Sequence, residues 1–158
     1  MKLSYRHLYS LSAAVQDPAS AALGGDRFVL LGGIDAAGTS TANIVVADLH
    51  GPSATATLPG AQHDAQAAAL TRRVYVFGGG EFSQYDHILR YDPATNSVSS
   101  AGVLPQAASD VAVTGSDGTA YVVGGFDGTN WLDTIVAYRS GSGARVVAHL
   151  PVALRYAA

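Results

Sequence analysis

Short apolar runs alternate with loops rich in Gly, Asp, Asn, Pro and Ser along most of the chain. Three runs end in paired glycines, at residues 28–31, 74–77 and 120–123. Three more follow the next loop, at residues 44–47, 88–91 and 135–138. Their lengths and their β-branched and aromatic side chains predict strands, whereas no segment holds a helical period. The pattern therefore predicts an all-β protein.

Two markers recur along the chain at an interval of 46 residues. Paired glycines occupy Gly32 and Gly33, Gly78 and Gly79, and Gly124 and Gly125. Leu-Pro pairs occupy residues 58–59, 104–105 and 150–151. A fixed period of this length is typical of a repeat architecture in which each repeat is one supersecondary unit.

Each repeat contains four strand-sized segments, which is typical of one blade of a β-propeller. The first segment of each repeat is made of small residues, at 19–22, 65–69 and 111–113, and should lie nearest the crowded central axis. The expected fold is an incomplete propeller of four-stranded antiparallel blades. An N-terminal segment, 1–14, precedes it, and the blades cover 15–58, 61–104 and 107–150, with the first strand of a fourth at 154–158.

The glycine pairs have a structural explanation, because glycine permits a positive φ and a close approach of neighbouring backbone at the end of a strand. A phosphate-binding loop would need a following helix and a Gly-x-Gly-x-x-Gly or Gly-Lys-Ser/Thr arrangement, and the sequence has neither.

Composition narrows the function classes. The chain has 158 residues, a formal net charge of −3 and nine scattered Lys and Arg residues, so nucleic acid is not an expected partner. It has no cysteine and no histidines at metal-ligand spacing, so no disulfide, cofactor or metal site is expected. The alanine-rich, lysine-poor composition is typical of high-GC bacteria.

The N-terminal segment begins with basic residues and a short apolar stretch that Tyr9, Ser10 and Ser12 interrupt. The stretch is too short to span a membrane. A secretory signal peptide is the alternative to an ordinary soluble start, but no Ala-x-Ala cleavage site follows a continuous apolar run. The compartment stays open.

The middle repeat carries a family resemblance. Residues 75–79 (Tyr-Val-Phe-Gly-Gly), 91–96 (Tyr-Asp-Pro-Ala-Thr-Asn) and 104–105 (Leu-Pro) together resemble a Kelch repeat. The third repeat has Tyr138-Arg139 where Kelch has Tyr-Asp, and the first repeat is weaker. All three lack the fourth-strand Trp typical of Kelch, which Val98 replaces in the middle repeat.

The resemblance implies a non-catalytic scaffold that binds a protein or peptide through the loops of one rim. Two sets of loops lie on this rim according to the chain connectivity: those that follow the glycine pairs and those that lead into each first strand. Loops on a rigid scaffold commonly carry binding residues. The candidate binding residues are His63, Asp64, Glu81, Gln84, Tyr85, Ser109, Asp110, Asp127, Asn130, Trp131, Arg155 and Tyr156. No catalytic residue is assigned.

Some Kelch proteins resemble sugar-modifying enzymes, so a carbohydrate-binding or epimerase-like propeller is the alternative function. An epimerase needs an acid and a base that converge in the channel, and the candidates are Asp64, Asp110 and Arg155. Asp64 and Asp110 occupy equivalent positions, where they either cap turns or form a ring of polar ligands. His63 is expected to be a surface residue pointing away from Asp64.

Two further questions stay open at the sequence level. Trp131 either fills the gap between two blades or stands on the rim as a stacking surface for a partner. Three blades leave two sheet faces uncovered, so the chain is either a piece of a longer propeller or closes a ring by self-association.

Overall fold

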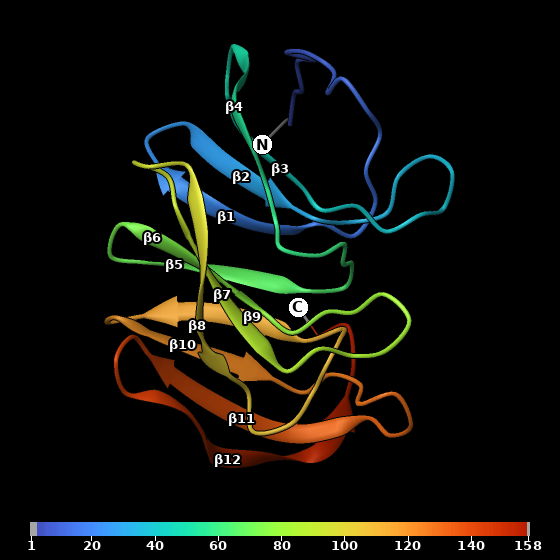
Figure 1. Ribbon diagram of the computed structural model, residues 1–158, viewed down its shortest axis with the longest axis vertical. Helices are drawn as coiled ribbons and strands as arrows, with labels where there is room; N and C mark the ends of the chain where they lie inside the picture. Colours follow the sequence, from blue (N-terminus) through green and yellow to red (C-terminus); the bar gives the residue numbers. More distant parts are fainter. Residues whose placement is uncertain (1–2, 158) are drawn as a thin grey trace.

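The computed structural model describes residues 3–157, which form twelve strands and no helix (Figure 1). The strands are β1 (Ala19–Gly24), β2 (Arg27–Leu31), β3 (Asn43–Asp48), β4 (Gly51–Thr57), β5 (Gln66–Leu70), β6 (Arg73–Phe77), β7 (His87–Asp92), β8 (Ser97–Val103), β9 (Ala112–Ser116), β10 (Thr119–Val123), β11 (Leu132–Arg139) and β12 (Gly143–Leu154). Nothing in residues 3–157 forms a helix long and apolar enough to cross a membrane.

The strands form three four-stranded sheets, β1–β4, β5–β8 and β9–β12, each in sequence order and with antiparallel neighbours. The sheets fan out side by side without closing into a ring, and the first strands β1, β5 and β9 lie against one another (Figure 1). This arrangement confirms the expected fold of incomplete propeller blades, with the small-residue strands innermost.

The middle sheet is buried on both faces, which explains its continuous apolar strands. Phe77 and Tyr75 pack against the ring of Tyr138 in the third sheet, with ring centroids 5.5 and 5.2 Å apart. Val76, on the opposite face of β6, belongs to the cluster shared with Val29 of the first sheet. Burial of each such large side chain contributes about 1.5–3 kcal/mol, so packing between blades is the main stabilising term.

The glycine pairs of the first two blades each contact the segment that leads into the next blade. The N–H of Gly79 donates to the carbonyl oxygen of Ala108, 2.9 Å away, in the segment leading into the next first strand. Gly78 has a φ of +61°, and a Cβ there would collide with that same carbonyl. The first pair repeats this contact with the carbonyl of Gln62, and the third pair repeats it with the carbonyl of Leu154, at the end of β12 in its own sheet. The spacing of the glycines thus reflects a hydrogen bond that recurs in every repeat.

Both ends of the chain differ from a simple repeat. Leu150 and Pro151 lie inside β12, which continues to Leu154 and pairs with β11 through two register irregularities. Residues 155–157 form no strand, and the last residue of the expected first strand, Ala158, lies outside the described residues. Residues 11–15 run over the outward face of the first sheet and enclose a cavity of about 360 Å³ with Leu30 and Val45.

Candidate functional site at one rim

The loops that follow the glycine pairs lie beside the segments that lead into the first strands. Isolated β-bridges join Gln16 to Ile34, His63 to Gly80 and Ser109 to Phe126. Three such bridges place both sets of loops on one rim, at the right of Figure 1. The candidate residues chosen from the sequence therefore share one face of the fan.

Four residues at equivalent positions surround the inner end of this rim: Asp17, Asp64, Asp110 and Tyr156. All four have left-handed backbone, with φ of 50°, 54°, 57° and 52° respectively. The N–H of each of the last three donates to the carbonyl of the one before it, at 3.4, 2.9 and 2.9 Å. Asp tolerates this conformation better than most residues. The backbone thus carries three carboxylates around the inner edge of the rim.

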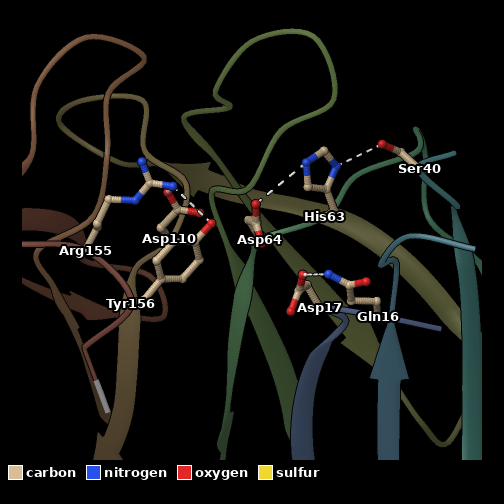
Figure 2. Close-up of polar contacts among 8 residues, drawn as sticks. All are labelled: Gln16, Asp17, Ser40, His63, Asp64, Asp110, Arg155 and Tyr156. Atoms are coloured by element: carbon tan, nitrogen blue, oxygen red, sulfur yellow. Dashed lines mark hydrogen bonds and ion pairs between the residues drawn. The ribbon is translucent and has the colours of Figure 1, made fainter. Parts of the chain in front are cut away.

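Arg155 makes an ion pair in this group. Its Nη2 lies 2.9 Å from Oδ2 of Asp110 and donates to the hydroxyl of Tyr156 at 3.0 Å (Figure 2). Its guanidinium carbon stands 4.9 Å from the ring centroid of Phe126 and 4.6 Å from that of Tyr156. The two aromatic contacts and the buried carboxylate hold the Arg155 side chain in place.

His63 lies closer to Asp64 than the sequence argument allowed. Its Nε2 is 3.6 Å from Oδ2 of Asp64, and its Nδ1 is 2.9 Å from Oγ of Ser40 (Figure 2). The expectation that the two side chains point to opposite faces was wrong, because Asp64 has a positive φ and lies outside the extended strand. His63 is half-buried rather than a free surface residue.

The carboxylates face a pocket of about 240 Å³. Its walls are Asp17, Asp64, Ala65, Gln66, Asp110, Val111, Tyr156 and Ala157. Within the described residues, neither Asp64 nor Asp110 accepts a hydrogen bond from a backbone N–H, which disfavours the turn-capping interpretation. Asp110 is 4% exposed and its Oδ1 is buried with no hydrogen-bond partner in that part of the chain.

Burial, together with the nearby Asp110 carboxylate, raises the pKa of Asp64 from its ordinary value of 3.8 to about 6, while His63 acts in the opposite direction. Desolvation and a neighbouring like charge both disfavour the ionised form. Asp64 therefore changes protonation close to neutral pH, which ordinary surface carboxylates do not.

Several other candidate binding residues make contacts within the rim loops or between neighbouring ones. Asp127 accepts hydrogen bonds from the N–H groups of Thr129 at 2.8 Å and Asn130 at 2.6 Å, and these bonds lower its pKa. The Tyr85 hydroxyl donates to the carbonyl of Ala61. Gln84 reaches across to Gly128 of the next blade, and Ser109 is buried at its bridge. These side chains order the loops instead of facing solvent freely.

The exposed aromatic side chains distinguish this rim. Trp131, in the rim loop of the third blade, is 58% exposed. Phe82 is 97% exposed and Tyr156 is 60% exposed. Glu81 and Asn130 add polar groups beside them.

Sequence reasoning missed Asp17. The only sequence signal that Asp17 lies beside Asp64 and Asp110 is its position, 47 residues before Asp64 and just ahead of a strand of small residues. Residues 3–157 contain no group of three or more His, Cys, Asp or Glu side chains arranged to hold a metal ion.

Comparisons with known proteins give the fold alone. The chain matches no protein-family model and no curated protein. A solved structure described as "Structure of YjhT" is similar over 91% of this chain, with a TM-score of 0.77 and 17% sequence identity. The chain spans about half of that protein, 54% of its length.

Proposed function

We propose that this protein is a Kelch-type propeller module that binds a protein or peptide partner through the rim that carries Phe82, Trp131 and Tyr156. The 46-residue repeat, the Tyr-Val-Phe-Gly-Gly segment and the three four-stranded sheets support the Kelch assignment. The exposure of three aromatic side chains on one rim is the observation that carries the binding function.

Exposed aromatic side chains on ordered loops suit a binding surface. Tyr and Trp are enriched among the residues that contribute most to binding energy, because they bury a large area with few rotatable bonds. Trp131 follows a loop that Asp127 fixes by accepting two backbone N–H groups. The loop is therefore already ordered before a partner binds, which lowers the entropic cost of association.

Selection from a random peptide library on the immobilised protein tests this proposal. Enriched peptides should lose at least about tenfold in affinity, about 1.4 kcal/mol, on the Phe82→Ala/Trp131→Ala variant. Leu49→Ala is the matched control, since Leu49 is a large exposed side chain in the β3–β4 turn, on the opposite rim. Peptides that bind both variants equally would refute the rim assignment.

A sugar-modifying activity is the second candidate, favoured by the raised pKa of Asp64 beside Asp110 and Arg155. A carboxyl group that titrates near pH 6 is suited to general acid–base catalysis. The test is deuterium incorporation from D2O into a panel of monosaccharides, followed by NMR. An Asp64→Asn/Asp110→Asn variant that stays folded and keeps its turnover would remove this candidate.

A further inference from the structure

The pocket between Asp17, Asp64 and Asp110 holds more negative than positive charge. Arg155 compensates one carboxylate, through its 2.9 Å contact with Oδ2 of Asp110. Asp17 receives only a neutral donor, Nε2 of Gln16 at 2.9 Å. Asp64 faces His63 and its two acidic neighbours. Two carboxylates thus line the pocket with no permanently cationic partner of their own among the described residues.

A second observation concerns the buried end of the pocket. Oδ1 of Asp110 has no donor in the described residues, although Asp110 is 4% exposed and lines the pocket. A buried acceptor left unsatisfied costs free energy, and more so on a charged group. A ligand that brings a donor to this oxygen would recover that cost.

The pocket suits a small charged group at the end of a thin aliphatic chain. Ala65, Val111 and Ala157 are small apolar walls, and the ring of Tyr156 lies at the exposed side. The ammonium group of lysine is a compact charge with three N–H donors and no acceptor. Such a group brings the positive charge that Asp17 and Asp64 lack and a donor for Oδ1 of Asp110.

We propose that this pocket is a subsite for the ammonium group of a lysine side chain of the partner, received between Asp17 and Asp64 with Oδ1 of Asp110 at its deep end. The inference rests on the proposed binding function and adds the partner chemistry that the rim selects. The aromatic side chains bind the surrounding peptide, and the carboxylates bind its lysine.

Binding at this subsite depends on pH. At pH values near or below 6 a proton on Asp64 offsets part of the excess negative charge, and an incoming ammonium group displaces it. The charged or titratable groups that face Asp64 are His63, Asp17, Asp110, Arg155 and Tyr156. Protonation of Asp64 removes a negative charge from the pocket, so affinity for a cation falls as the pH decreases from 8 to 5.

Titration of the 15N-labelled protein with N-acetyl-lysine-methylamide tests the subsite directly. We expect saturable amide shifts at residues 64, 110 and 156, with a Kd on the order of millimolar at pH 8 and at least about tenfold weaker binding at pH 5. N-acetyl-norleucine-methylamide, which lacks the charge, should cause no saturable shift. Equal binding of the two probes, or no saturation by lysine, would overturn the proposal.

Variants separate the carboxylates from general charge effects. Asp64→Asn keeps the size of the side chain and tolerates the positive φ, and it should weaken binding of the lysine probe at least about tenfold. Asp26→Asn removes an exposed carboxylate from the β1–β2 turn on the opposite rim and should leave binding unchanged. Unchanged binding by a folded Asp64→Asn variant contradicts the subsite.

The two proposals fail in different ways. If selected peptides need Phe82 and Trp131 but bind equally well after Asp64→Asn, the subsite is refuted and the rim function stands. If the lysine probe needs Asp64 while selected peptides ignore Phe82 and Trp131, the subsite stands and the rim function is refuted. Both proposals are supported only if the lysine of a selected peptide and Asp64 act together. Replacing that lysine should weaken binding to the wild type, but it should cost little further affinity on the Asp64→Asn variant.

Discussion

Asp64→Asn should stabilise the protein at neutral and alkaline pH. The folded-state pKa of Asp64 is raised to about 6 from 3.8, so ionisation of this group opposes folding. Each pKa unit corresponds to about 1.36 kcal/mol, which sets an upper bound of about 3 kcal/mol. The side chain retains 17% exposure and solvent screens part of the interaction, so we expect about 1–2 kcal/mol.

The sign of the pH dependence follows from linkage. Well below pH 3.8 the carboxyl group is protonated in both the folded and the unfolded state, so wild type and variant should have similar stability. Between pH 4 and 6 the unfolded chain releases the proton first, and the wild type loses stability relative to the variant. Above about pH 7, where the group is ionised in both states, the difference should be constant.

Urea unfolding followed by far-UV circular dichroism at pH 4, 5, 6, 7 and 8 measures this difference. Asp26→Asn serves as the control, since Asp26 is exposed in a turn on the opposite rim. A difference between wild type and Asp64→Asn that does not grow between pH 4 and 6, or that favours the wild type at pH 8, would refute the assigned environment of Asp64.

Three other predictions address the fold and the rim. Gly78→Ala should destabilise by about 3 kcal/mol or more, whereas Gly118→Ala, also at positive φ but in open space, should cost about 1 kcal/mol; equal costs in thermal unfolding would contradict the contact between blades. Phe77→Ala should cost about 3–5 kcal/mol by the same assay, because this ring is fully buried. Asp127→Ala should speed amide hydrogen exchange at residues 128–131, and unchanged protection would show that other contacts order the loop.

The fold was predictable because the sequence repeats its interactions at a constant spacing. Gly78 and Gly79 are required by the backbone contact with Ala108, and the same contact recurs in the other two repeats. Burial of both faces of β6 likewise shows in the unbroken run 74–77. Such features constrain side-chain type strongly, so they are visible in one sequence.

The details of the rim were not predictable in the same way. The left-handed backbone of Asp64 brings its side chain toward His63, and no composition rule marks that conformation at a non-glycine residue. Asp17 escaped notice because its repeat is the most divergent and is spaced by 47 residues. The exposure of Trp131 depends on how the rim loops fold in three dimensions, which a local pattern does not contain.

Chemical-shift mapping of a selected peptide on the 15N-labelled protein tests the central claim most directly. The account predicts the largest amide shifts in the loops at residues 80–86 and 126–131 and at residues 64, 110 and 156. Shifts concentrated in the turns of the opposite rim, at residues 24–27, 48–51 and 116–119, would contradict it.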